Sequence, residues 1–340
     1  MRKRIVLLLS SFLFATLISG WVNLAEAQQP GKVYRIAYVC GCSRPLGAHH
    51  IAFWQRLREL GYVEGQNLVI EERNLKGTGS RKSQAAKLAA EMVRLKLDVI
   101  VTRPGATVTG EFVRATRTIP IVMPGIRADP VEEGFVMSLA RPGGNITGIT
   151  NLRSKLYPKR LQLLKQAFPR MSRVSILWSR SRERRSMKDI EPVAQALGIK
   201  IQSLHVHRPG HLERAFSAIL HADRAQPGKS PRGLIVATSF VMLSNQVRMI
   251  EFAAERKLPA IYDGSSWVDA GGLMYFGADS VALRRRTATY VDKILKGAKP
   301  GDLPIERSTN FHFGINLKTA KQLGVTIPPA VLYQATKVIK

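Results

Sequence analysis

Short runs of β-branched and apolar residues alternate with amphipathic stretches along almost the whole chain after Val33. Several of these runs are apolar almost throughout, which is typical of central strands in a parallel sheet covered on both faces. The expected strands are 34–39, 68–72, 98–102, 119–123, 145–150, 173–178, 200–206, 233–238, 259–263 and 272–277. Regular alternation of strands and helices favours doubly wound α/β layers over a sandwich or a helical bundle.

The stretches between these runs have helical periodicity. In HHIAFWQRLREL, Ile51, Trp54, Leu57 and Leu60 form one apolar stripe, and Gly61 is a typical residue to end the helix. The stretches around SRKSQAAKLAAEMVRLK, LYPKRLQLLKQAF, HLERAFSAILHA, SNQVRMIEFAAERK and ALRRRTATYVDKILKG continue the alternation. We therefore expect a helix after almost every strand.

The two halves of the chain share one pattern. DVIVT, a helix and RTIPIVM in the first half are matched by GLIVAT, a helix and RKLPAIYD in the second. Two βαβ units can look alike by chance, yet the pattern favours two similar lobes with a first boundary near GNITGIT (145–150). Open α/β sheets bind ligands at the carboxyl ends of their strands, so two facing lobes would enclose a solute by hinge closure.

The first residues are typical of a secretory signal peptide. Arg2, Lys3 and Arg4 precede a long apolar run, which ends in the small-x-small pattern AEA. An uncleaved membrane anchor is the competing interpretation, because the run approaches the length of a membrane span. We expect a signal peptide at 1–27, cleaved after Ala27, and a mature chain that works outside the inner membrane.

The formal net charge of +28 suggests nucleic acid as one possible partner. The basic residues are scattered along the whole chain, however, apart from the run SRSRERRS (179–186). No helix-turn-helix, zinc-finger or RNA-binding signature accompanies them. We therefore expect a generally basic surface and no nucleic-acid partner.

The only two cysteines raise the question of a metal site. Cys40 and Cys42 precede His49 and His50, and thiolates with imidazoles suit Zn or Cu(I). The spacing matches none of the strong Cys/His signatures, and two adjacent histidines do not easily converge on one ion. An exported metal-binding protein stays open as an alternative. The simpler interpretation is that the stretch 39–50 closes the first strand and opens the first helix, with no metal and no cofactor.

Catalytic signatures are missing from the sequence. It has no G-x-S-x-G elbow, P-loop, H-E-x-x-H or full G-x-G-x-x-G motif. Seven histidines are present, but none stands in a recognisable arrangement with a nucleophile and a carboxylate. We expect that the protein is not an enzyme, with an α/β enzyme of unrecognised type as the alternative.

Four segments resemble substrate-binding proteins of ABC transporters, in the branch that contains tryptophan- and tyrosine-type binders. They are ELGYVEGQNLVIEER (59–73), IPIVMPGIRADPVEEGFVMSLARPGGNITGIT (119–150), LPAIYDGSSWVDAGGLMYFG (258–277) and YVDKILKGAKPGDLPIERSTNFHFGINLKTAKQLGVTIPP (290–329). The resemblance runs from about Val33 to the C-terminus and preserves the order and spacing of the motifs.

This resemblance implies a type I periplasmic-binding-protein fold, an α/β architecture of two Rossmann-like doubly wound parallel-sheet lobes joined by a three-strand hinge. GNITGIT, GLMYFGAD and the segment near LPIERSTNF would be the three crossovers. The N-terminal lobe would comprise 28–149 plus 277–304, and the C-terminal lobe 150–276 plus 305–340. The resemblance also implies a periplasmic monomer that binds a small molecule and delivers it to an inner-membrane ABC permease. The expected solute is an amino acid or a related aromatic or carboxylate compound.

The strand rule and the family fold point to the same loops in the first lobe. After the first strand, Cys42 and Ser43 would contact the ligand, although a helix-capping loop is equally compatible; relatives usually carry small polar residues here, so the cysteines depart from the pattern. After DVIVT, a glycine opens a helix and offers free N–H groups to a carboxylate. Gly105, Ala106 and Thr107 are the carboxylate candidates, and an ordinary helix N-terminus capped by Thr107 is the alternative.

The loop after IPIVM holds two more candidates. Asp129 would accept from a ligand amine, but an Asp directly before Pro130 is also a good helix N-cap. Arg127 would pair with an acidic solute, or would simply be exposed.

In the second lobe the loops after three strands carry aromatic, hydroxyl and carboxylate groups. An aromatic ring would stack on an apolar or ring-bearing solute, although burial in the core is an equal alternative for the tryptophan. A carboxylate would anchor an ammonium group. The candidates are Trp178, Ser179, Ser239, Phe240, Tyr262 and Asp263.

Overall fold

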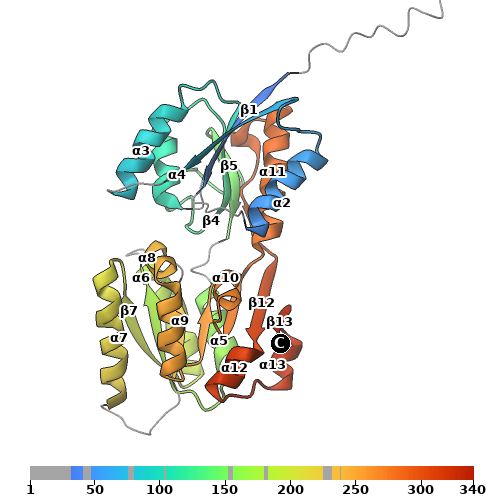
Figure 1. Ribbon diagram of the computed structural model, residues 1–340. Coiled ribbons are helices and arrows are strands. Elements are labelled where there is room, and N and C mark those ends of the chain that lie inside the picture. Colours follow the sequence, from blue (N-terminus) through green and yellow to red (C-terminus); the bar gives the residue numbers. More distant parts are fainter. Residues whose placement is uncertain are drawn as a thin grey trace, which may run out of the picture.

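The structure is a computed structural model that describes residues 32–40, 47–75, 80–102, 105–151, 156–179, 183–224, 232–237 and 239–340 (Figure 1). The expected signal peptide at 1–27 lies outside the described residues. The helices and strands form two α/β units, each built on its own sheet. Among the described residues, no helix combines the length and the apolar character that a bilayer crossing requires.

The first unit is built on a parallel sheet. In the described part of the chain it has six strands in the order β11-β5-β4-β3-β1-β2. The chain leaves β1 in one direction for β2 and in the other for β3, so the strand order switches at β1. The strands are β1 (Tyr34–Cys40), β2 (Leu68–Asn74), β3 (Val99–Val101), β4 (Ile121–Ile126), β5 (Ile146–Thr150) and β11 (Glu306–Arg307).

Helices cover both faces of this sheet. Successive residues of a strand point to opposite faces. Ile36 and Tyr38 of β1 therefore pack with α2 and α11, whereas Ala37 and Val39 pack with α3 and α4. The helices are α2 (Ala48–Glu59), α3 (Arg81–Met92), α4 (Ala106–Ala115) and α11 (Ser280–Leu295), and the short 3-10 helix η3 (Pro300–Asp302) follows α11.

The second unit repeats this plan on a mainly parallel sheet. Within the described residues the strand order is β13-β12-β10-β9-β8-β6-β7, and β12 is antiparallel to β10. The order switches at β6, as it does at β1 in the first unit. The strands are β6 (Arg173–Trp178), β7 (Lys200–His205), β8 (Arg232–Val236), β9 (Ala260–Tyr262), β10 (Met274–Ala278), β12 (Phe311–Asn316) and β13 (Lys337–Ile339).

Two core layers flank the second sheet. Side chains of α5, α6, α12 and α13 fill one layer, and those of α7, α8, α9 and α10 fill the other. The helices are α5 (Tyr157–Ala167), α6 (Glu183–Ala196), α7 (Pro209–Arg224), α8 (Phe240–Ser244), α9 (Gln246–Glu255), α10 (Ser265–Asp269), α12 (Leu317–Leu323) and α13 (Pro329–Tyr333). Burial on both faces accounts for the nearly continuous apolar strands of the sequence.

The chain passes between the two sheets three times. It leaves the first sheet after β5 for α5, returns after β10 to α11, and leaves again after β11 for β12. Helix α11 packs against α2 and β4, although more than 200 residues separate it from α2 in the sequence. The expected α/β class, two doubly wound lobes joined by a three-strand hinge, is confirmed.

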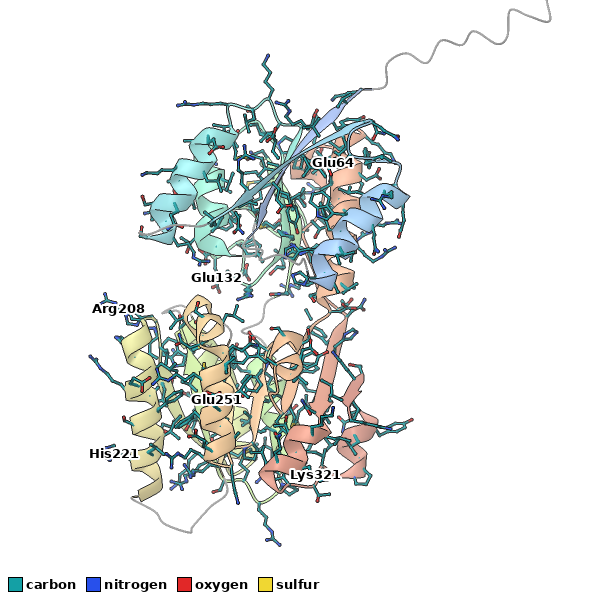
Figure 2. All side chains as sticks on the ribbon, viewed as in Figure 1. Glu64, Glu132, Arg208, His221, Glu251 and Lys321 are labelled. Atoms are coloured by element: carbon teal, nitrogen blue, oxygen red, sulfur yellow. The ribbon has the colours of Figure 1, made fainter. Side chains whose placement is uncertain are left out.

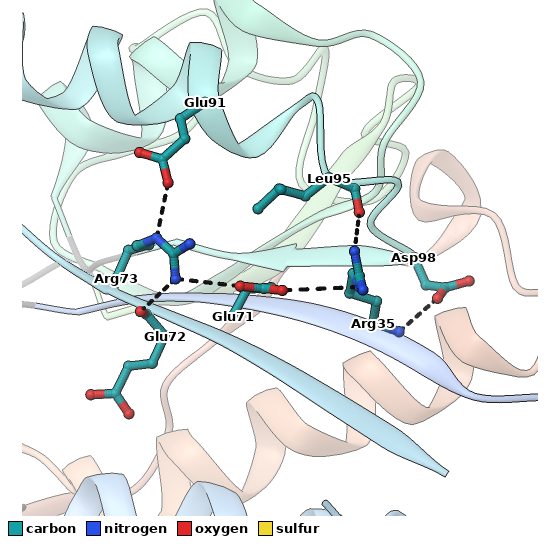
Figure 3. A network of polar contacts seen from close by, with 7 residues as sticks. All are labelled: Arg35, Glu71, Glu72, Arg73, Glu91, Leu95 and Asp98. Atoms are coloured by element: carbon teal, nitrogen blue, oxygen red, sulfur yellow. Dashed lines mark hydrogen bonds and ion pairs between the residues drawn. The ribbon is translucent and has the colours of Figure 1, made fainter. Parts of the chain in front are cut away.

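Edge strand β2 is held by a network of charged side chains (Figure 3). Arg73 pairs with Glu71 at 3.3 Å on its own strand and with Glu91 of α3 at 3.0 Å. Glu71 also lies 4.0 Å from Arg35 of β1, whose backbone N–H donates to Asp98 at 2.8 Å. Charged side chains on an edge strand discourage pairing with another chain.

The carboxyl ends of the two sheets face each other. Figure 2 shows Glu132, which follows β4, at the end of the first unit nearest the second, and Arg208, which follows β7, at the end of the second unit nearest the first. Loops that follow parallel strands therefore lie on both sides of the space between the units.

Candidate functional site

The predicted site residues of the first unit follow neighbouring strands. Strands β1, β3 and β4 lie side by side in the sheet, so the loops after them share one edge. Gly105, Ala106 and Thr107 follow β3, and Arg127 follows β4. Cys42 and Ser43, which the sequence places after β1, lie outside the described residues.

Helix α4 begins without a side-chain cap. Gly105 is its N-cap residue, and Thr107 lies exposed in the first turn, so the alternative of a Thr107 cap is wrong. The first N–H groups of an α-helix have no partner within the helix. Beside them, the Thr102 and Thr109 hydroxyls are 3.1 Å apart and buried. Unshared N–H groups and the positive end of the helix dipole suit an anionic group.

The loop after β4 uses Asp129 to shape the backbone. The Val131 N–H donates to Asp129 Oδ1 at 2.9 Å. Residues 130–134 form turns and no helix, so the expected helix N-cap at Asp129 is wrong, and its carboxylate stabilises a turn instead. Arg127 beside it is half-buried.

In the second unit, the first candidate residue, Trp178, is mostly buried in the core. Trp178, the last residue of β6, is 8% exposed, and its Nε1 donates to Ser203 Oγ at 2.7 Å. Its ring lies 4.4 Å from that of His205 at the end of β7. His205 Nε2 also lies 3.0 Å from the carbonyl oxygen of Ser179. Trp178 thus presents at most an edge to the space between the units.

Ser239 caps the short helix that follows β8. The Met242 N–H donates to Ser239 Oγ at 3.2 Å, and Ser239 is half-buried. Phe240 is the first residue of α8. The serine hydroxyl, with one lone pair engaged by the backbone, retains a proton to donate to a solute.

The two residues at the end of β9 are both buried, but they have different surroundings. Tyr262 is 1% exposed and stacks on Trp267 with ring centroids 4.7 Å apart, and burial raises the pKa of its hydroxyl. Its side chain therefore belongs to the core and does not reach the loop surface. Asp263 directly after it is 3% exposed, at the carboxyl end of the strand. A buried carboxylate here suits a cationic group of a ligand.

The stretch with the cysteines and histidines closes β1 and opens α2, as the simpler interpretation expects. β1 ends at Cys40 and α2 starts at Ala48. His50 Nδ1 lies 2.7 Å from the Tyr38 hydroxyl, and the His49 and His50 rings are 4.2 Å apart. Among the described residues no three His, Cys, Asp or Glu side chains form a group that could hold a metal ion. Cys42 lies outside that part of the chain.

Two residues at this edge were not identified from the sequence. Arg284 of α11 is 7% exposed, and its Nη1 donates to the Pro124 carbonyl of β4 at 3.3 Å. Asn151 directly after β5 is 6% exposed, and within the described part of the chain its Oδ1 has no hydrogen-bond donor. Arg284 shares a helical stripe with the apolar Ala288 and Val291, and that spacing is the signal that could have identified it.

Burial and nearby charges, that of Arg284 among them, shift the pKa values of the groups at this edge of the sheet. Desolvation and then the Arg284 charge lower the pKa of His49 to about 4, so its imidazole is neutral at pH 7. Burial raises the pKa of the Tyr38 hydroxyl, the Arg284 charge opposes the rise, and the Glu72 charge adds to it. The edge therefore combines a buried cation that has no ion-pair partner among the described residues with a neutral imidazole, an arrangement that suits binding of an anionic solute.

Comparison with known proteins gives a consistent result. A tyrosine-binding protein of Clostridioides difficile is 26% identical over 275 residues, which are 80% of this chain and 75% of that protein. A conserved domain protein of Vibrio cholerae has a crystal structure that superposes with a TM-score of 0.78 at 28% identity, over 90% of this chain and 100% of that chain. A domain from Streptococcus pneumoniae in complex with L-Trp superposes with a TM-score of 0.77 at 24% identity, over 91% of this chain and 100% of that chain.

The sequence model of one family covers most of the chain. It is described as ABC transporter substrate binding protein and matches residues 48–339. Members of this family are solute-binding proteins rather than enzymes, and they deliver small molecules to ABC permeases. The protein described here, with two α/β units whose strand carboxyl ends face each other, belongs to the family of ABC transporter substrate-binding proteins.

Proposed function

We propose that the protein is a periplasmic receptor that binds an amino acid between its two lobes and delivers it to an inner-membrane ABC importer. The observation that carries the proposal is the family match over residues 48–339, together with facing loops that hold an uncapped helix N-terminus and a buried carboxylate. The tyrosine-binding relative supports an amino acid as the solute. The basic, apolar N-terminal segment supports export through a signal peptide at 1–27.

The lobes follow from where the chain passes between the sheets. We infer an N-terminal lobe of 28–149 plus 277–304 and a C-terminal lobe of 150–276 plus 305–340. The crossings after β5 and β10 support the first two boundaries, whereas β11 (Glu306–Arg307) pairs with β5 in the first sheet and favours a third boundary after Arg307 rather than at 304. The charged network on edge strand β2 supports a monomer.

The two ends of an amino acid have separate partners in this proposal. The carboxylate binds the N–H groups at the start of α4, around Gly105, Ala106 and Thr107. The ammonium binds Asp263 on the opposite lobe. Arg127 follows β4, the strand beside β3, and Ser239 follows β8, the strand beside β9, so both would contribute further polar contacts. Closure of the lobes brings both ends of the solute into contact at once.

The test is a thermal-shift screen of the mature protein against the amino acids, followed by calorimetry of each hit. A ligand that binds only the folded state stabilises it by about 2.7 kcal/mol at 100 times its Kd, so a true solute raises Tm clearly. For tyrosine, the analogues tyramine and 3-(4-hydroxyphenyl)propionate lack one charged end each and should bind more weakly than the amino acid. A screen in which no amino acid raises Tm contradicts the proposal.

Asp263→Asn tests the ammonium contact. Loss of a charged hydrogen-bond partner should weaken amino-acid binding by about tenfold or more. It should leave the weaker binding of the analogue without an amine unchanged. The matched control is Asp269→Asn, because Asp269 is exposed and pairs with Lys337 at 2.6 Å on the surface. Equal affinity of the Asp263 variant and the wild type for the amino acid argues against this contact.

A further inference from the structure

Three consecutive arginines of α11 lie in three different environments. Arg285 forms a two-bond pair with Glu59, at 2.9 and 2.7 Å, and Arg286 pairs with Glu306. Both side chains are more than 40% exposed. Arg284 is 7% exposed, and its side chain donates one hydrogen bond to a backbone carbonyl. The buried member of the row is thus the one without a carboxylate.

No carboxylate side chain among the described residues pairs with Arg284. The sequence also limits which other carboxylates could do so. The segments 41–46, 76–79, 103–104 and 152–155, which interrupt or border the first unit and fall outside the described residues, contain no Asp and no Glu. None of the Arg284 side-chain nitrogens is among the fully buried atoms that lack a hydrogen-bond partner, so the nitrogens that make no bond stay accessible to a ligand. A neutral carbonyl at 3.3 Å satisfies one of the five N–H donors of the side chain.

The position of Arg284 is at the edge where solutes bind in this architecture. It lies in the second turn of α11, which starts directly after the chain returns from β10. Its hydrogen-bond acceptor, Pro124, belongs to the second half of β4, and a Cβ at Gly125 of the same strand would lie 3.1 Å from Cδ1 of the preceding Leu283. The charge of Arg284 acts to lower the pKa values of Tyr38, near the end of β1, and of His49, at the start of α2.

No carboxylate in the described part of the chain forms an ion pair with Arg284, although the charge of Glu72 also acts on Tyr38. His49 is neutral at pH 7, because desolvation and the Arg284 charge lower its pKa to about 4. Tyr38 and His50 share a hydrogen bond with each other, at 2.7 Å. These groups can hydrogen-bond to a solute but cannot neutralise a cation. An anionic ligand from outside the protein would therefore serve as the counter-ion of Arg284.

We propose that Arg284 is a ligand-binding residue that takes a carboxylate group of the transported solute. The inference rests on the proposed solute-binding function and restricts the solute to organic anions and zwitterions. A guanidinium binds a carboxylate through two parallel N–H···O bonds, which gives selectivity against the corresponding amide. In an amino acid, Arg284 and the N–H groups at the start of α4 bind the same α-carboxylate, and in a dicarboxylate they take one carboxylate each.

The test compares Arg284→Met with Arg285→Met. Methionine keeps the unbranched, apolar stem of arginine and removes the charge, and Arg285 is the matched control on the same helix. Without ligand, Arg284→Met should have a higher Tm than the wild type, because an unpaired buried charge is removed. Arg285→Met should have an equal or lower Tm, because it breaks a surface pair with Glu59. A fall in the Tm of Arg284→Met below that of the control overturns the proposal, since the residue would then be structural.

The binding arm uses a defined panel measured by thermal shift and calorimetry. It contains the amino acids, their amides, mono- and dicarboxylic acids, and inorganic phosphate and sulfate as minimal anions. The wild type should prefer each acid over its amide, and Arg284→Met should lose about tenfold to a hundredfold in affinity for the acid. It should not lose affinity for the amide. Arg284→Lys should keep part of the preference, because it retains the charge but not the paired donors.

The outcomes separate this inference from the proposed function. If only organic acids other than amino acids bind the wild type, and Arg284→Met has lost affinity for them, the amino-acid proposal is wrong and the role of Arg284 stands. If an amino acid binds wild type and Arg284→Met equally well, the role of Arg284 is overturned and the proposed function stands. A wild-type protein that only uncharged solutes stabilise, or that no member of the panel stabilises, also overturns the inference.

Discussion

At the scale of single residues, the environment decides what a side chain can do. Desolvation and then the Arg284 charge hold the pKa of His49 near 4. Tyr262 and Asp263 are neighbours, but the first stacks on Trp267 in the core and the second follows the end of the strand. Adjacent residues at the end of a strand therefore serve different purposes.

His49 predicts a specific pH dependence of stability. Its pKa is 6.5 in the unfolded chain and about 4 in the folded protein. Between these values the unfolded chain binds a proton that the folded protein does not, so acidification favours unfolding. The contribution of His49 is fully present above pH 6.5 and is lost as the pH falls towards about 4. Urea unfolding between pH 4 and 8 should show this loss for the wild type and less of it for His49→Gln.

The control for that experiment is a histidine far from the site. His221 lies on α7 at the end of the second unit that faces away from the first (Figure 2). His221→Gln should follow the wild-type pH profile. If the profiles of His49→Gln and the wild type are parallel between pH 4 and 6.5, His49 is not held neutral in the folded protein.

At the scale of elements, close contact between β4 and β5 positions the chain where it leaves the first sheet for the hinge. β5 is the last strand before the first crossing, and Gly148 in its centre pairs with Met123 of β4. Gly148 has a φ of +127°, a conformation that side chains rarely adopt. A Cβ here would lie 2.4 Å from the Met123 carbonyl oxygen. The glycine lets two strands at the hinge approach closely.

Gly148→Ala should therefore destabilise the protein strongly. The added Cβ meets backbone atoms that cannot move away without separating β4 from β5, and the backbone conformation is strained as well. We expect a loss of about 3 kcal/mol or more in the free energy of unfolding, measured by urea denaturation. Gly144→Ala is the matched control, because a Cβ at Gly144 would meet nothing within 4 Å. Equal stability of the two variants would contradict this account of the strand contact.

At the scale of the whole molecule, three crossings connect two units that otherwise have separate cores. Each unit has its own sheet with a helix layer on either face. Rotation about the crossings changes the distance between the two sets of loops while both cores stay intact. Because cores are closely packed, motion at the crossings is the easiest way to enclose a solute.

Small-angle X-ray scattering tests this hinge directly. Saturation with a solute identified in the screen should reduce the radius of gyration, because the lobes approach each other around it. The far-ultraviolet circular dichroism should stay the same, since each lobe moves as a unit. Stoichiometric binding with an unchanged radius of gyration would show that the solute binds without closure.

Much of the fold is predictable from the sequence, because strand and helix periodicity reflects burial that is local along the chain. All ten strands expected from apolar runs are present, with bounds that differ by at most three residues at either end. β13 was not expected, because its three residues, Lys337–Ile339, are too few to show a pattern. The helix expected after Asp129 is also absent, because a good N-cap residue does not by itself determine whether a helix follows it.

The sequence by itself determined the α/β class, the repeated plan of the two halves and the loops where polar groups would gather, because strand order along the chain and the direction of parallel strands imply them. Only the tertiary structure decided which members of those loops are accessible. It placed the Tyr262 side chain in the core, left α4 without a side-chain cap and brought Arg284 from α11 to the end of β4. Contacts between distant segments depend on how helices pack across a sheet, and no local pattern encodes them.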